Sequence, residues 1–263
     1  HTESTFRDAA GFKSTLLNRS LDVLFVLNEI ANLGQQDISF LKGLVNADQT
    51  ALIGYSMGGY GVINVAGGGY SPQAAQFFSS MSSGSKALQK RTVGNPEFDA
   101  SIDPRIKAVV ALAPWGMQRG VWDAEGLAGI KIPSLFVGGS LDDISGYEKG
   151  TKAIFEGAVN SDRYLLTYIN ARHNVAPNPP PPESFEPGLH IDEYLRYADS
   201  VWDMRRINNI NQHVITAFLG IHLKNKEEYK SFLSIGTDEQ KKNWPGFKPR
   251  TSVGLQLDYS AAE

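Results

Sequence analysis

The chain has 263 residues, of which 41% are hydrophobic and 20% are charged, and its formal net charge is -3. This composition excludes an intrinsically disordered chain, and the small negative charge excludes the basic surface that nucleic-acid binding needs. The sequence contains no cysteine, which excludes disulfides, thiolate catalysis and cysteine-ligated zinc. No apolar run approaches the ~20 residues of a membrane-spanning helix, so no membrane span is expected.

Strands and helices are predicted to alternate along the chain. Apolar residues recur at helical spacing over 8–33, and Gly34 is expected to stop this helix. Short apolar runs predict buried strands at 50–54, 106–113, 133–138 and 163–169. Helices are expected after the first strand, from about 146 to 155, and over 203–224. This order predicts a single α/β domain over 1–263, with a mostly parallel sheet flanked by helices on both faces.

Two segments interrupt this alternation. Residues 67–103 are rich in Gly, Ser, Gln and Lys, which is typical of an insertion and suggests a small lid. Residues 177–182 hold five prolines and one asparagine. Because the chain that follows is too short to form a domain, the wider stretch 174–202 is interpreted as a proline-rich surface loop.

The first candidate for chemistry is the run Gly54-Tyr55-Ser56-Met57-Gly58, which fits the G-x-S-x-G pattern. A predicted strand precedes it and a helix follows it, as this motif requires. The nucleophile stands on a tight, strained turn, and glycines two positions before and after it let the neighbouring backbone approach. The backbone N–H of Met57 is then a candidate donor to an oxyanion.

An acid and a base are expected to follow the serine in that order. Asp142 comes directly after the strand at 133–138 and is the chosen acid, with Asp143 as the alternative. Either aspartate is also suited to capping the helix near residue 146. His173 lies in the loop after the strand ending at residue 169, where the base should stand. Ser56, Asp142 and His173 are therefore the predicted catalytic residues.

No cofactor or metal is expected. The histidines show no H-E-x-x-H spacing, and the chain has no glycine-rich phosphate loop of the P-loop type. The remaining histidines are interpreted as terminal, surface or structural residues.

With these residues in place, the sequence resembles the dienelactone-hydrolase-like branch of the α/β-hydrolases, which includes relatives of platelet-activating-factor acetylhydrolase. A serine nucleophile departs from the true dienelactone hydrolases, which use cysteine, and so implies a general carboxylic-ester hydrolase. Bacterial polyester hydrolases have a similar G-x-S-M-G-G elbow, so a polymer ester is a possible substrate beside small-molecule esters. The resemblance rests on residues 54–59, 132–142 and 170–173.

The resemblance also implies that part of the fold is missing. The family places several strands, and the loop with the second oxyanion donor, ahead of the elbow. Here residues 16–30 resemble the helix just before the elbow strand, so the first strands are expected to be absent from this chain. Half a sheet leaves an apolar strand edge and an exposed core face. A separate N-terminal fragment is therefore expected to complete the sheet and the oxyanion hole.

The predicted activity is hydrolysis of a carboxylic ester through an acyl-enzyme. The alternatives are a serine peptidase or amidase of the same fold, and a catalytically silent binding protein. Two residues are expected to bind substrate: Tyr55, which is part of the elbow, and Trp115, which comes just after the second predicted strand. Aromatic and apolar residues of the 67–103 insertion are further candidates for an acyl pocket, with ordinary core packing as the alternative: Phe77, Phe78 and Met81.

Overall fold

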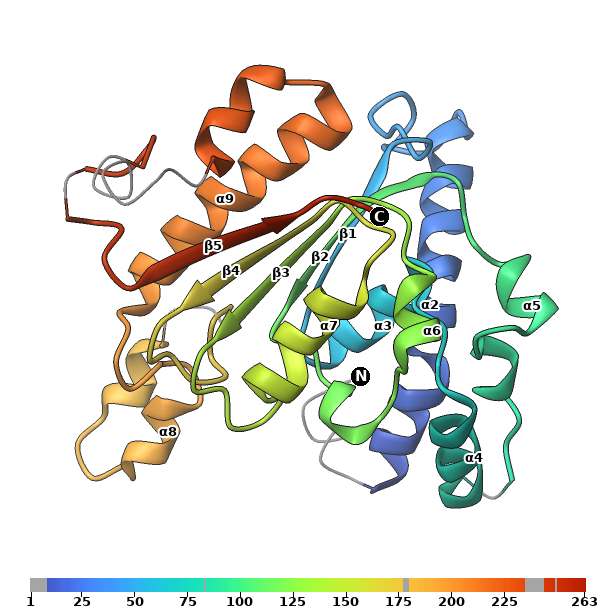
Figure 1. The fold of residues 1–263 in the computed structure, drawn as a ribbon, viewed down its shortest axis with the longest axis horizontal. Helices are drawn as coiled ribbons and strands as arrows, with labels where there is room; N and C mark the ends of the chain where they lie inside the picture. The colour runs from blue at the N-terminus through green and yellow to red at the C-terminus, as the bar shows by residue number, and fades with distance from the viewer. Residues whose placement is uncertain (1–8, 83, 177–179, 235–243, 249) are drawn as a thin grey trace.

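A five-stranded sheet forms the centre of the computed structural model, which describes residues 9–82, 84–176, 180–234, 244–248 and 250–263 (Figure 1). The strands lie side by side in chain order, the first four are parallel, and the fifth is antiparallel to the fourth. The α/β class and the mostly parallel sheet are thus confirmed. The strands are β1 (Thr50–Tyr55), β2 (Ile106–Leu112), β3 (Ser134–Gly139), β4 (Arg163–Tyr168) and β5 (Leu255–Ser260).

The first four strands lie within a residue or two of their predicted bounds, but β5 was not predicted. Its apolar residues alternate with polar ones, and only Leu257 is buried, so the strand lacks the continuous apolar run that marks the others. Antiparallel pairing at the sheet edge explains this pattern, because one face of an edge strand meets solvent.

Helices cover both faces of the sheet. Figure 1 shows α9 on one side and α3, α6 and α7 on the other. Buried residues of β2 point alternately into two cores, with Val109 packing on the α3 side and Val110 on the α9 side. The helices are α2 (Ala9–Gln35), α3 (Met57–Val65), α4 (Pro72–Met81), α5 (Pro96–Asp99), α6 (Ala124–Ala128), α7 (Lys152–Gly157), α8 (Ile191–Leu195) and α9 (Met204–Lys224).

Two helix boundaries differ from expectation. Helix α2 continues through Gly34 to Gln35, so the expected stop at Gly34 is wrong. Gly34 lacks the positive φ that a glycine adopts when it ends a helix in the left-handed conformation. The helix expected near residue 146 begins as a π-helical turn, Tyr147–Thr151, before α7.

The two segments that interrupt the alternation differ in their packing. Residues 67–103 contain α4 and α5 and are anchored in the core by buried side chains, among them Tyr70, Phe78 and Arg91. Tyr70 stacks on Tyr60 of α3, with ring centroids 5.1 Å apart. In 174–202, α8 buries no residue, but both ends of the segment reach the core on the α9 side through Val175, Ala198 and Trp202. The segment 67–103 is therefore firmly attached to the body of the domain.

The order of the strands places three loops together. Because parallel strands all run the same way, the residues that follow β1, β3 and β4 emerge at one edge of the sheet. Crevices at the carboxyl ends of such strands are where ligands bind in open α/β sheets. Ser56, Asp142 and His173 are all in these loops. None of the helices in the described ranges has the length and apolarity to cross a membrane.

Two histidines of α9 are expected to make the stability of the fold depend on pH. Burial lowers the pKa of His213, which lies between the rings of Phe232 and Phe247. Burial also lowers the pKa of His222, against the opposing charge of Asp162. The unfolded chain binds protons at these positions first, so we expect the free energy of unfolding to fall as the pH drops below ~6.5.

Urea denaturation at about pH 7.5 and about pH 5 measures this effect. A His213→Gln/His222→Gln variant is expected to lose less stability over this interval than the wild type. An equal loss in both proteins would show that these histidines do not carry the pH dependence.

Candidate active site

Ser56 occupies a strained turn between β1 and α3. Its backbone has φ 53° and ψ -114°, a region that residues other than glycine rarely adopt. The Ser56 N–H donates to Leu112 O at 2.9 Å, and the Ser56 carbonyl accepts from Tyr60 N and Trp115 N, each at 3.1 Å. Bonds to β2, to the loop after it and to α3 therefore hold the strained backbone in place.

Close backbone packing explains one of the two flanking glycines. A Cβ at Gly54 would lie 2.4 Å from the carbonyl carbon and oxygen of Gly58, and such a contact is impossible. A Cβ at Gly58 would meet nothing within 4 Å. The second crowded position is Gly59, where a Cβ would lie 2.8 Å from Pro114. The sequence-based expectation that Gly58 must be small for lack of space is therefore wrong.

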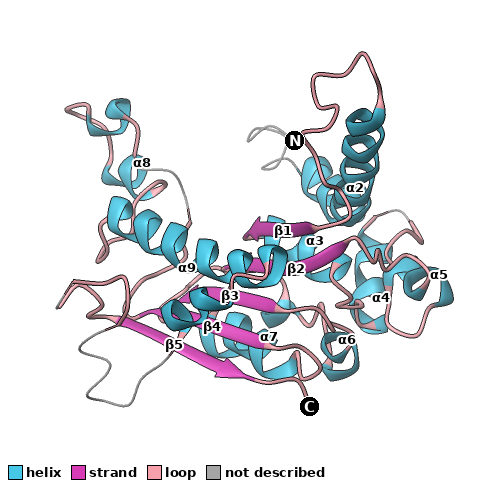
Figure 2. Ribbon diagram, turned by 90° about the horizontal axis from the view of Figure 1, so that it is seen from above, coloured by secondary structure: helices cyan, strands magenta, loops and turns pink. Residues whose placement is uncertain are grey.

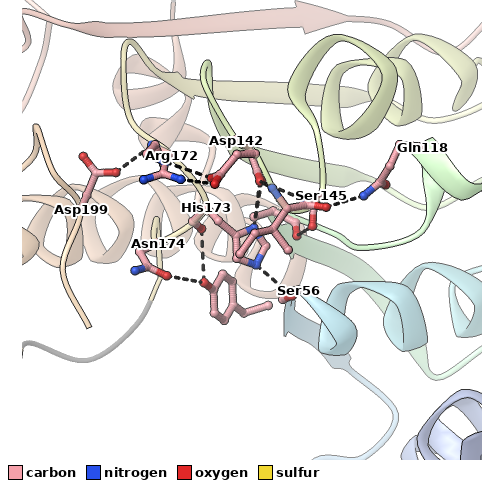
Figure 3. Close-up of polar contacts among 12 residues, drawn as sticks. Ser56, Gln118, Asp142, Ser145, Arg172, His173, Asn174 and Asp199 are labelled. Carbon is pink, nitrogen blue, oxygen red and sulfur yellow. Dashed lines mark hydrogen bonds and ion pairs between the residues drawn. The ribbon is translucent and has the colours of Figure 1, made fainter. Parts of the chain in front are cut away.

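The three predicted catalytic side chains form one hydrogen-bonded chain (Figure 3). His173 Nε2 lies 3.0 Å from Ser56 Oγ. His173 Nδ1 lies 3.1 and 3.0 Å from the two carboxylate oxygens of Asp142. The Asp142 side chain is 0% exposed and that of His173 is 9% exposed. Because Asp142 accepts from Nδ1, the neutral imidazole presents its acceptor nitrogen to the serine.

The two aspartates left open by the sequence have separate surroundings. Asp142 Oδ1 also accepts from the N–H groups of Ile144 and Ser145, at 2.9 and 2.8 Å. The Ser145 hydroxyl donates to Ala113 O at 2.9 Å, which ties this loop to the end of β2. Asp142 therefore faces the histidine from a fixed loop.

Asp143 points to the surface and pairs with Arg172. Burial is the largest single influence on Asp143 and opposes its ionisation, but the hydrogen bonds from Arg172, a backbone hydrogen bond and the nearby positive charge together outweigh it and lower the pKa of this carboxyl. The geometry thus brings Asp142, and not Asp143, to the histidine. Neither aspartate caps the following π-helical turn, whose N-cap residue is Gly146.

The predicted oxyanion donor stands at a helix start. Met57 is the first residue of α3, so its N–H has no acceptor inside the helix. The positive end of the helix dipole adds to the attraction for a negative oxygen beside Ser56.

The residues expected to bind substrate have other neighbours in the structure. The ring of Trp115 packs edge-on against Phe12 and Tyr60, with centroids 5.8 and 6.1 Å apart. Tyr55 lies against the His173 ring, with centroids 5.3 Å apart. Phe78 is a buried core residue, which is the alternative left open for it, whereas Phe77 and Met81 are exposed on α4.

Three residues that support the histidine loop were not predicted. Asn174 Nδ2 donates to Leu195 O and Ala198 O at 2.7 and 2.9 Å. Asp199 Oδ2 accepts from Arg172 N at 2.7 Å, and Arg172 in turn pairs with Asp143. Arg172 and Asn174 adjoin the histidine in sequence, which was a usable signal. Nothing in the sequence marks Asp199, which lies inside the segment interpreted as a surface loop.

The other histidines lie elsewhere. His190 is exposed and accepts from Asp192 N at the start of α8. Within the part of the chain that the structure describes, no three His, Asp or Glu side chains gather in a way that could hold a metal ion.

Comparison with known proteins adds no relative. No protein-family profile matches the chain, and no curated protein matches it.

The two glycines of the elbow provide a matched test of the turn. We expect Gly54→Ala to destabilise the protein by about 1–3 kcal/mol, the usual penalty for overpacking, because its methyl group would collide with the Gly58 backbone. We expect Gly58→Ala to cause no loss, because its methyl group has room and alanine is the better helix former. Urea denaturation of the two variants measures both values, and equal losses would contradict the packing argument.

Proposed function

We propose that the protein is a serine hydrolase of the α/β-hydrolase type that cleaves carboxylic esters through an acyl-enzyme. The observation that carries this proposal is the 3.0 Å contact between Ser56 Oγ and His173 Nε2, with Nδ1 held by a buried Asp142. The order serine, aspartate, histidine along the chain, each after a parallel strand, supports this fold type.

In the acylation step, Ser56 Oγ attacks the ester carbonyl while His173 Nε2 takes the hydroxyl proton. The carbonyl oxygen becomes an oxyanion, and the Met57 N–H donates to it. The C–O bond to the alcohol then breaks, and the imidazolium returns its proton to the leaving oxygen. Asp142 stabilises the imidazolium and holds the ring in the orientation that the transfer needs.

In the deacylation step, water replaces the alcohol. His173 takes a proton from the water as its oxygen attacks the acyl carbon, and the bond between that carbon and Ser56 Oγ then breaks. The proton returns to Ser56, and the carboxylic acid leaves. Each proton that His173 accepts is thus given back within the same half-reaction.

Esters are favoured over amides by the resemblance of residues 54–59 to the elbows of ester hydrolases. A peptidase or amidase would use the same three side chains, so the site geometry alone does not separate these activities. Matched ester and amide substrates with the same acyl group do so directly, and we expect the ester to be cleaved faster.

We expect the wild type to hydrolyse p-nitrophenyl esters and Ser56→Ala to lose at least about a thousandfold in kcat, because the nucleophile is removed. An ester series from acetate to longer acyl chains measures the activity, and labelling by a fluorophosphonate probe reports the reactive serine independently. A folded wild type, isolated together with any polypeptide that completes its sheet, that neither turns over nor takes the label is a binding protein rather than a hydrolase.

The adjacent aspartates provide the matched control. Asp142→Asn removes the carboxylate that holds His173, and we expect a large loss of kcat. Asp143→Asn breaks only an exposed pair with Arg172, and we expect activity within about twofold of the wild type. Equal losses in the two variants would contradict the assignment of the acid.

We further propose that additional polypeptide pairs with the free edge of β1. No strand among the described residues lies on that edge, and α2 extends past it (Figure 2). Ile53 of β1 is 53% exposed, and Phe25 and Val26 of α2 are also exposed. A parallel strand beside β1, with its own covering element, would bury this apolar surface and close the edge. Such a segment would also be in a position to supply the second oxyanion donor.

Mass spectrometry of the active protein isolated from its natural source tests this second proposal. We expect polypeptide beyond residues 1–263, either covalently joined or as a tightly bound fragment. A preparation that is fully active and holds only these residues would overturn it.

A further inference from the structure

We propose that Tyr55 is a positioning residue that fixes the backbone of the histidine loop to the end of β1. This inference rests on the proposed function, and it replaces the expected contact between Tyr55 and substrate. Tyr55 is the last residue of β1 and immediately precedes Ser56. One strand end would therefore hold both the nucleophile and the backbone of its base.

The Tyr55 hydroxyl forms its hydrogen bonds with the histidine loop. It donates toward His173 O at 3.2 Å and toward Asn174 Oδ1 at 3.3 Å. Burial, together with the charge of Asp142, raises the pKa of this hydroxyl far above its usual value, so it keeps its proton. Its ring lies against the imidazole at an interplanar angle of 30°. The side chain thus supports His173 both through the ring face and through the backbone.

The orientation of Asn174 follows from its other bonds. The two protons of its amide group are directed to Leu195 O and Ala198 O. Its oxygen is therefore the atom that faces Tyr55, where it accepts from the hydroxyl. The opposite orientation of the amide is excluded, because it would place Asn174 Oδ1 against the carbonyl oxygens of Leu195 and Ala198, with no proton between them.

Residues 195–202 complete the support from the far side. Asp199 is buried, and its carboxylate accepts from the N–H groups of Arg172, Val201 and Trp202 at 2.7 to 2.9 Å. Figure 3 shows Asp199 and Asn174 on the same side of the histidine loop. The loop is thus held between two anchors, Tyr55 on β1 and the 195–202 segment. Of these, only Tyr55 also adjoins the nucleophile.

The position of His173 affects the rate of the proposed reaction, because a proton passes from Ser56 Oγ to His173 Nε2. A misplacement of about 1 Å between reacting groups reduces the rate by as much as a hundredfold. Loss of the Tyr55 hydroxyl leaves His173 O with one remaining donor, Val175 N at 2.8 Å. The loop would then keep its fold, but the His173 side chain would be held less firmly. We therefore expect kcat to fall and substrate binding to stay unchanged.

Tyr55→Phe tests the inference because it keeps the ring and removes only the hydroxyl. We expect kcat for a p-nitrophenyl ester to fall on the order of tenfold with KM unchanged. Tyr70→Phe is the matched control, since it removes a buried hydroxyl contact with Ser20 of 2.9 Å, and we expect its kcat to stay at the wild-type value. Values of kcat are expressed per fluorophosphonate-reactive serine, so that a smaller folded fraction does not imitate the effect.

Asn174→Ala tests the same support of the histidine loop from the other side, because it removes the side chain that links Tyr55 to the 195–202 segment. We expect it to lower kcat, and the double variant with Tyr55→Phe to lose less than the product of the two single losses, because both residues act on one loop. A kcat within twofold of the wild type in Tyr55→Phe overturns the proposal. A raised KM with unchanged kcat also overturns it, because that result places Tyr55 against the substrate.

A spectroscopic measurement separates this inference from the proposed function. The proton between His173 Nδ1 and Asp142 is expected to give a far-downfield NMR signal in the wild type, and this signal needs no substrate. We expect exchange with solvent to broaden it in Tyr55→Phe and leave it sharp in Tyr70→Phe. If the wild type, isolated together with any polypeptide that completes its sheet, is inactive but shows this pattern, the esterase is disproved and the positioning role stands, whereas an equally sharp signal in Tyr55→Phe overturns that role.

Discussion

The close approach of Gly54 to the backbone of Gly58 is the contact on which the rest of the site depends. Without a side chain at Gly54, β1 can turn into α3 within one residue. That turn places Ser56 just beyond the end of β1 and directly before Met57, the first residue of α3. The loops after β3 and β4 then need only ordinary connections to bring an acid and a base to it, because parallel strands end at the same edge.

Much of the fold could be predicted because buried parallel strands carry an unbroken apolar run. Almost every residue of β2 and β3 is buried, because helices cover both faces of the sheet. Such strands have a continuous apolar run in the sequence instead of an alternating pattern. The strand β5 was not predicted, because it is half exposed and follows a long stretch without apolar periodicity. The end of α2 was placed one residue early, because a glycine after a helix usually ends it by adopting a positive φ, and Gly34 does not adopt one.

Some residues of the candidate site could likewise be predicted from the sequence, and others could not. Ser56, Asp142 and His173 stand at fixed places relative to strands, so their order and spacing made them predictable. The choice between Asp142 and Asp143 depended on a turn of one residue, and only the geometry of hydrogen bonds distinguishes them. The supporting role of Asp199 could not be predicted, because it comes from a distant segment whose composition is that of a surface loop. The sequence thus identifies the three residues of the candidate triad better than the residues that hold them in place.

The distance along the chain between the serine and the histidine has a consequence for the newly made protein. Their contact joins residues 117 positions apart, on the loops after β1 and β4, and β2 and β3 lie between those two strands in the sheet. The contact therefore exists only once the sheet has brought the two loops together. Until then Ser56 is an ordinary alcohol, since a serine hydroxyl is a weak nucleophile without its base. Under the proposed function, a nascent or partly folded chain would therefore be unreactive toward esters, and reactivity would begin only when the two loops meet.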